Sequence, residues 1–369
     1  MKKFIAISVV LACVAGSAFA DTSISGSIET KWTIVNGATD GDGYAYSGPV
    51  EMHSGAIQFA GANDENTFGA IFKFTDGTWT DRAFVWWQPI DQLRINLGKD
   101  GDGWFEQSNL ARWGFHNMPR NISVENWNAG DFMYQNWDKW SVAFILKPVS
   151  GLTVNLAVAT KDARVGVISY DEEKQNAFSD YYAQASYSIS GVGNVAATFR
   201  NEGVGSEPTL SIAYKDGGFI DGLAFDVGFS YVFDAKKGDG ATVNDPFRFG
   251  WGVHYSGGDW GIKHRAYFRP IEEKKNASGV VTQKSGIQAN WIDFMPWYQF
   301  EEMQVLCNIR IILNAPTADG AGKTGWHVNP YIRKRMGGGH DFRVGVMVED
   351  HNGDGEMNWN LATSWLFAF

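Results

Sequence analysis

The last stretch of the chain, residues 357–369, reads MNWNLATSWLFAF and alternates large side chains with small or polar ones up to its end. One face carries Met357, Trp359 and then every second residue as far as Phe369. A period of two residues is typical of a β-strand, because successive side chains point to opposite faces of a sheet. The stretch therefore predicts a strand with one largely apolar face that ends on an aromatic residue.

The same alternation recurs in residues 151–161, 221–233 and 246–256. Each segment is long enough to cross a membrane as a tilted strand, which needs roughly 9–11 residues. A soluble β-sandwich also alternates. Aromatic residues near the strand ends and a polar opposite face, however, are typical of the girdles and the wet lumen of a membrane barrel. The sequence therefore predicts an all-β fold, a transmembrane antiparallel up-and-down β-barrel.

Reading every segment in this way predicts about eighteen strands, with sixteen as the alternative. The predicted strands are 22–34, 51–60, 66–75, 80–88, 91–98, 138–148, 151–161, 179–189, 193–200, 207–216, 221–233, 246–256, 259–270, 286–299, 302–313, 324–336, 340–349 and 357–369. Within one of them the apolar phase changes from Ile287 and Ala289 to Ile292 and Phe294. A β-bulge is therefore expected near Trp291, since one extra residue changes the facing of the residues that follow.

The connections between the predicted strands fall into two sets. The even-numbered ones have at most five residues, whereas the odd-numbered ones are longer with the exception of 76–79. Bacterial membrane barrels have short periplasmic turns and longer outer loops. The odd connections are therefore predicted to face outward, and an even strand count places both termini on the periplasmic side. The longest outer connection, 99–137, is aromatic and charged, and a loop of this length is usually functional.

The N-terminus has the organisation of an export signal. Two lysines precede an apolar run over residues 4–14, and the A-x-A sequence at 18–20 follows. This pattern predicts a signal peptide over residues 1–20 with cleavage after Ala20, and the run is too short to be a membrane-spanning helix. Residues 21–369 then form one β-barrel domain, located in the bacterial outer membrane.

Charge and cysteine content exclude several classes of function. Removing the two lysines of the signal takes the formal net charge from −10 to −12, which argues against a nucleic-acid partner. Cys307 is the only cysteine after the signal, so the mature chain has no intrachain disulfide and no cysteine metal cluster. Cys13 follows Val-Leu-Ala, which loosely resembles a bacterial lipoprotein box, so lipidation there is an alternative to signal cleavage after Ala20.

Three short stretches resemble the bacterial outer-membrane porin family. They are SISGSIE at residues 23–29, LRINLG at 93–98, and the final strand that closes on Phe369. The resemblance implies a passive, water-filled channel for small hydrophilic solutes and ions, and it suggests a homotrimer. In that family the third outer loop folds into the barrel and narrows it, and the third outer connection of this chain is 99–137.

The phase of each strand predicts which charged residues line the lumen. A charge on the lipid face costs roughly 2–4 kcal/mol near the midplane, so strand arginines and lysines belong inside. The candidate pore-lining and constriction residues are Arg94, Asp100, Asp102, Glu106, Arg112, Arg120, Arg248, Lys263, Arg265, Arg310, Arg333, Arg335 and Arg343. Acids of the long loop facing this basic wall would produce a transverse field that orients polar solutes. Alternatively, the arginines neutralise lumen carboxylates such as Glu29, Asp226, Asp341 and Glu349.

One acidic turn is a weak candidate for calcium. Asp350, Asn352 and Asp354 stand at positions 1, 3 and 5 of a segment with glycine at position 6, like the start of a calcium loop. The twelfth position is Leu361 rather than glutamate, so the segment is no EF-hand. Asp, Asn and Gly are also ordinary residues of a tight hairpin turn. Apart from this calcium candidate, no cofactor is expected.

Other functions compete with the general channel. A sugar-selective pore could use Trp104, Trp113 and Trp127 for stacking, and a surface adhesin would need longer loops than most of these. An enzyme could use His254 or His327, which lie on lumen phases. No Ser/His pair, metal spacing or phosphate-binding loop accompanies those histidines. The sequence therefore predicts a channel rather than an enzyme.

Overall fold

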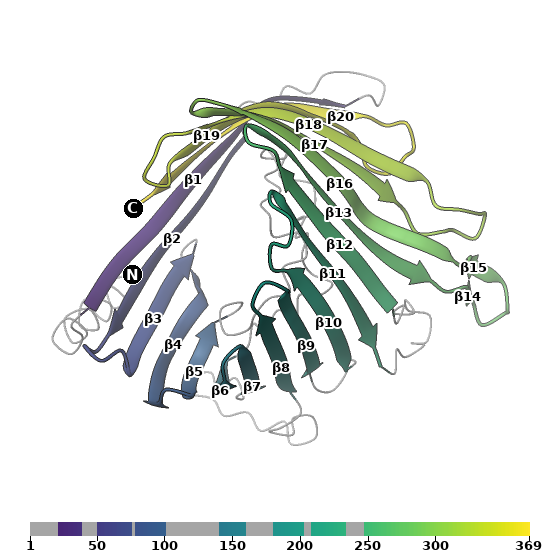
Figure 1. Cartoon of the computed structure of the whole chain (residues 1–369). Coiled ribbons are helices and arrows are strands. Elements are labelled where there is room, and N and C mark those ends of the chain that lie inside the picture. Colours follow the sequence, from purple (N-terminus) through teal and green to yellow (C-terminus); the bar gives the residue numbers. More distant parts are fainter. Residues whose placement is uncertain are drawn as a thin grey trace.

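The structure is a computed structural model that describes residues 21–38, 50–75, 78–100, 140–159, 180–202, 208–233 and 247–369. Eighteen strands of this described part form one antiparallel sheet, and β1 closes it by pairing with both β2 and β20 (Figure 1). The barrel strands are β1 (Asp21–Ala38), β2 (Val50–Ala62), β3 (Phe68–Thr75), β4 (Thr78–Ile90), β5 (Leu93–Asp100), β6 (Ser141–Val149), β7 (Leu152–Ala159), β8 (Asp180–Ile189), β9 (Gly193–Glu202), β10 (Thr209–Asp216), β11 (Leu223–Val232), β12 (Phe247–Ser256), β13 (Trp260–Ile271), β16 (Gly286–Phe300), β17 (Met303–Leu313), β18 (Thr324–Arg335), β19 (Asp341–Asp350) and β20 (Asn358–Ala368).

The predicted strand count is confirmed, and the sixteen-strand alternative is wrong. Predicted and observed boundaries differ by a few residues, with the largest extension at β1, which continues to Ala38 rather than ending at residue 34. A small hairpin of β14 (Lys274–Lys275) and β15 (Val281–Gln283) was not predicted. Its strands are too short for a period of two to be visible. No helix among the described residues is long and apolar enough to cross a bilayer.

The barrel is polar inside and apolar outside. On β17 the inward positions include Asn308 and Arg310, both with 0% exposure, whereas the outward Val305 is 41% exposed. β20 shows the same arrangement of polar residues inside and apolar residues outside, since Asn360 and Ser364 are buried and Phe367 is exposed. Side chains that face outward would meet lipid, and the inward faces gather polar groups, as a membrane barrel requires.

A β-bulge in β16 reverses the facing of its residues, as predicted. Toward β13, Tyr267 pairs with Trp291 but Arg269 pairs with Gln288, so β16 contains one extra residue. The register toward β17 shifts between Ala289 and Ile292. Upstream of the shift Gln288 contacts the lumen residue Arg269, and downstream the odd-numbered positions face inward. A one-residue shift moves every following side chain to the other face, so the bulge decides which residues of β16 face the lumen.

Candidate functional site

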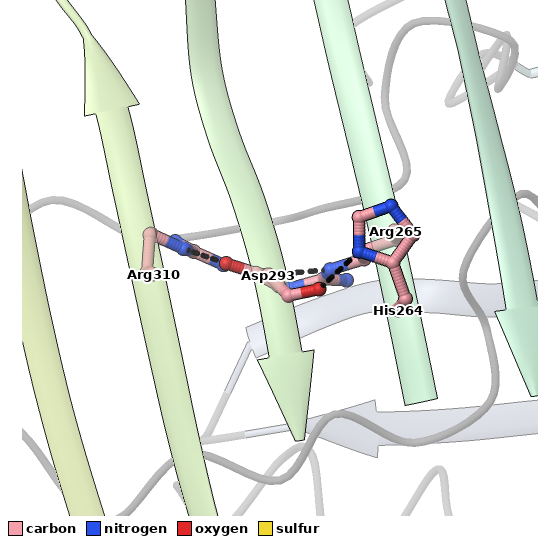
Figure 2. Close-up of polar contacts among 4 residues, drawn as sticks. All are labelled: His264, Arg265, Asp293 and Arg310. Atoms are coloured by element: carbon pink, nitrogen blue, oxygen red, sulfur yellow. Dashed lines mark hydrogen bonds and ion pairs between the residues drawn. The ribbon is translucent and has the colours of Figure 1, made fainter. Parts of the chain in front are cut away.

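The most strongly buried charge cluster lies on the lumen side of β13, β16 and β17. The Arg265 Nε donates to Asp293 Oδ2 at 2.6 Å. Arg310 donates from Nε to Asp293 Oδ1 and from Nη2 to Oδ2, both at 2.5 Å. Figure 2 shows the carboxylate of Asp293 between the two guanidiniums. The three side chains are 4%, 0% and 0% exposed for Arg265, Asp293 and Arg310, so solvent screens these contacts little.

Sequence and register together place this cluster. Arg265 and Arg310 are the direct cross-strand partners of Asp293. Side chains directly opposite each other on neighbouring strands have Cβ atoms about 5 Å apart, which allows both arginines to reach the same carboxylate. Asp293 faces them because it follows the bulge. The cluster carries two cations and one anion, so its formal net charge is +1.

A second cluster of the same composition lies on β18 and β19. The Asp341 Oδ2 accepts hydrogen bonds from Arg333 Nε at 2.6 Å and from Arg343 Nη2 at 2.9 Å. The side chains of Arg333 and Arg343 are 12% and 10% exposed, so this cluster is slightly more open than the first. Neutralisation of Asp341 by lumen arginines, the alternative drawn from the sequence, is confirmed for this carboxylate. This cluster also keeps a formal net charge of +1.

A stretch of wall with both apolar and amide side chains, among them Asn308 and Asn329, separates the two clusters. His327, the cross-strand partner of Arg310, lies six residues before Arg333 on β18, or about 20 Å at ~3.3 Å per strand residue. Between these levels lies a packed group on the inward face, made of Met295, Leu306, Tyr331, Ala362 and Trp297. The two clusters therefore lie at different levels along the strands, and Lys263, the register partner of Met295, lies between these levels.

Arg94 lies on β5, which is nine strands away from β16 in either direction around the ring of eighteen described strands. Its guanidinium carbon stands 4.2 Å from the ring centroid of Trp86, and its Nε donates to Asn96 Oδ1 at 3.0 Å. A cation over an indole ring is held by the electrostatic field of the ring. Trp86 in turn lies against Gly69, where an added Cβ would stand 2.5 Å from Cζ2 of Trp86. The absence of a side chain at Gly69 therefore leaves room for the indole of Trp86, and the indole in turn holds the guanidinium of Arg94.

The other predicted site residues are more scattered. Arg248 on β12 pairs in register with Ser230, Lys263 on β13 lies between His254 and Met295, and Arg335 stands at the end of β18 opposite Asp341. Arg248 and Lys263 are partly exposed, and Arg335 is exposed. Asp100 is the last residue of β5. The predicted residues Asp102, Glu106, Arg112 and Arg120, with most of the connection 99–137, lie outside the described residues.

Sequence reasoning missed several charged residues of the inward face, among them Asp293, Lys73 and Arg82. Asp293 stands between the apolar residues Ile292 and Phe294. Once a bulge is placed before it, this alternation predicts that Asp293 faces the lumen. Lys73 and Arg82 are direct partners across β3 and β4. Lys73 lies between two phenylalanines in sequence, so the alternation could have predicted its inward facing as well. These residues add one acid and two bases to the predicted set.

Of the calcium candidates, Asp350 is the last residue of β19, and Asn352 and Asp354 lie in the turn that follows. The Asp350 carboxylate accepts hydrogen bonds from the backbone N–H groups of residues 353–355 at 2.7–3.1 Å, and Glu356 N–H donates to Asp354 Oδ1 at 3.0 Å. These bonds are those of an Asx-type turn, in which a carboxylate replaces a backbone acceptor. In the described part of the chain no group of three or more acidic, histidine or cysteine side chains could hold a metal ion. The geometry therefore supports a plain hairpin turn.

A closed barrel with an apolar outer face and a charged inner face defines a class of protein, the outer-membrane channel. The family model described as Gram-negative porin matches residues 6–289, and the chain belongs to that family. The resemblance stated from the sequence is confirmed. The protein is an outer-membrane porin, and family and fold point to a channel without enzymatic activity.

Solved structures share the fold at low identity. The outer membrane protein OpdK from Pseudomonas aeruginosa is similar with a TM-score of 0.57 and 8% identity, over 95% of this chain and 100% of that chain. OccK5 (OpdH) from the same organism has a TM-score of 0.55 and 10% identity, over 95% and 99%. OpdK solved with vanillate has a TM-score of 0.57 and 9% identity, over 95% and 100%. No curated protein sequence matches the chain.

Proposed function

We propose that this porin is a general diffusion channel for small hydrophilic solutes, with a weak preference for anions. The observation that carries the preference is that the described inward positions hold more arginines and lysines than acids, also when the buried Asp226 and Glu349 are counted beside Asp293 and Asp341. Each of the two Arg–Asp–Arg clusters contains two arginines and one aspartate. Arg94, Arg248 and Lys263 are partly exposed on the same inward face. A lumen lined by one sign of charge raises the local concentration of the opposite ion.

The chain as a whole has the opposite sign, with a formal net charge of −10. Overall charge would therefore suggest attraction of cations, and the wall suggests attraction of anions. The wall is the better guide, because charges act on a permeating ion within about 8–10 Å at physiological salt. Acidic residues beyond that range have little influence on selectivity inside the pore.

The test is the reversal potential of the purified protein in planar bilayers under a salt gradient. We expect stepwise conductance and a reversal potential of the sign given by anion preference. Replacing Arg94 and Lys263 together with glutamine should reduce that preference. Lys275→Gln, a neutralisation in the exposed β14–β15 hairpin, is the matched control and should leave it unchanged. A cation preference in the unmodified protein would refute the anion proposal, and the absence of conductance would refute the channel.

A sugar-selective pore is less well supported. The inward aromatic residues Trp86 and Tyr331 are only 6% and 2% exposed, so they offer little surface to a sugar ring. Trp104, Trp113 and Trp127 lie outside the described residues. Because a structural neighbour was solved with vanillate, which is a small carboxylate, we choose vanillate as a probe beside neutral sugars. Faster liposome entry of vanillate than of a neutral sugar of similar size supports the anion proposal, and sugar block of the current would favour the alternative.

We also propose that the connection 99–137 constricts the pore. The support is that this connection is the longest outer one and the third in order, and that the third outer loop of the porin family folds into the barrel. Deleting residues 104–130 should raise the single-channel conductance. An unchanged conductance in a correctly folded deletion variant would place the constriction elsewhere.

Assembly and maturation complete the proposal. A homotrimer would run as a heat-modifiable band, and a strictly monomeric mass in detergent would exclude it. Cleavage after Ala20 predicts Asp21 as the first residue of the mature chain, which N-terminal sequencing checks. A lipid-modified N-terminus at Cys13 would overturn the cleavage prediction.

A further inference from the structure

His264 is a polar residue on the outward phase of β13. Its neighbours on the same face include Ile262, which is 37% exposed, and the ring of Phe294, whose centroid lies 4.5 Å from that of the histidine. Arg265, the next residue, points inward to Asp293 (Figure 2). A histidine on a face that meets lipid needs partners for both ring nitrogens, because an unpaired polar group is costly there.

Both nitrogens of His264 have partners. The Trp251 Nε1–H donates to His264 Nε2 at 3.0 Å. The His264 Nδ1 lies 2.9 Å from the backbone oxygen of Asp293, which can only accept. His264 therefore carries its proton on Nδ1 and none on Nε2, so the ring is neutral. The two hydrogen bonds together select a single tautomer.

Asp293 is bonded from both faces of the barrel wall, by His264 on the outer side and by two arginines on the lumen side. The backbone carbonyl of Asp293 is bound by His264, and its carboxylate is bound by Arg265 and Arg310 on the lumen side. Asp293 is regularly paired with both neighbouring strands and lies just after the irregular part of β16, which is confined to residues 288–292. A bulge leaves local backbone groups outside regular pairing. A side chain that binds the carbonyl of Asp293 restrains β16 immediately after this irregular part.

We propose that His264, itself held by Trp251, is a positioning residue for Asp293 and thereby sets how much positive charge the Arg265–Asp293–Arg310 cluster presents to the pore. With His264 in place, the carboxylate stays between both guanidiniums. Without it, β16 moves more freely at the bulge, and the arginines are paired less completely. The inference rests on the proposed anion-preferring channel.

The experiment is a double-mutant cycle between His264 and Asp293, measured as the anion-to-cation permeability ratio in planar bilayers. His264→Phe keeps an aromatic ring but loses both hydrogen bonds, and Asp293→Asn removes the negative charge of the cluster directly. Trp251→Phe removes only the donor to His264 and serves as a milder second variant. His340→Phe, the same exchange in the turn after β18, is the matched control.

We expect His264→Phe to raise the permeability ratio and the open-channel current noise, while His340→Phe changes neither. In the Asp293→Asn background, His264→Phe should have no further effect on the ratio, because residues acting through one contact are non-additive. Trp251→Phe should shift the ratio in the same direction by less. A merely structural histidine would lower the unfolding temperature equally in both backgrounds and leave the ratio unchanged.

An unchanged ratio in His264→Phe, or equal shifts in both backgrounds, would overturn the positioning role. These outcomes differ from failure of the proposed function, in which the unmodified protein would not conduct or would prefer cations. If His264→Phe does not assemble, the Trp251→Phe result decides alone. A ratio identical to that of the unmodified protein would then contradict the inference.

Discussion

Replacing Asp293 with asparagine should destabilise the barrel strongly. The substitution preserves shape but removes the negative charge to which Arg265 and Arg310 both bond, at 4% and 0% side-chain exposure. Removing one partner of a buried ionic group typically costs about 3–5 kcal/mol, because the remaining charge stays buried. We expect a loss in this range, with Arg310→Met recovering part of it by removing one of the two cations.

The corresponding change in the second cluster gives the comparison. Asp341→Asn leaves Arg333 and Arg343, which are 12% and 10% exposed and therefore better solvated. Loss of hydrogen bonds to a charged group there should cost about 1.5–3 kcal/mol. Both variants are compared with the unmodified protein by urea unfolding in lipid vesicles, followed by the fraction of the folded, faster-migrating band in unheated gels. A loss for Asp293→Asn below about 1 kcal/mol, the value of an exposed ion pair, would refute the reasoning.

Three further outcomes are expected. Gly69→Ala should change single-channel conductance, because the added Cβ stands 2.5 Å from Cζ2 of Trp86 and 2.6 Å from the backbone oxygen of Gly61, so that the indole and the β2–β3 pairing must both shift; an unchanged conductance in the folded variant would contradict this. The hydrogen bond from Glu356 N–H lowers the pKa of Asp354, so the stabilisation is present at neutral pH and lost only as pH falls through the lowered value. Hydrogen exchange at Glu356 should thus stay slow below the usual aspartate pKa of about 3.9, unlike in Asp354→Asn. Chelation of calcium should leave the unfolding temperature unchanged, since the Asp350 carboxylate is already bound to backbone N–H groups. A decrease in the unfolding temperature would indicate that calcium binds at this turn.

The barrel was predictable because its evidence is distributed along the whole sequence. Each strand repeats the same period, so an error at one boundary does not disturb the count. Even the bulge could be placed, since the apolar phase changes between Ala289 and Ile292 in the printed sequence. The β14–β15 hairpin was not found, because two- and three-residue strands carry no period.

The arrangement of the charged wall could be predicted only in part. Phase predicted that Arg265 and Arg310 face inward, but it gives neither the register between strands nor the height of a residue in the barrel. Pairing of both arginines with Asp293 depends on the one-residue shift in β16. The hydrogen bonds of His264 depend on Trp251, which is thirteen positions away in sequence and comes close only through the β12–β13 ladder. Such contacts follow from three-dimensional register rather than from any local pattern.

The pairing of β20 with both β1 and β19 has a consequence for the order of biogenesis. The ring acquires its last seam from residues 358–368, which come last in sequence among the described barrel strands. Until then β1 and β19 each have an edge with unpaired backbone groups, and lipid offers no partner for them. The chain must therefore be kept unclosed through its whole export and inserted only when complete. A nonsense mutation anywhere before the last strand should yield not a smaller pore but a chain that cannot remain in the membrane.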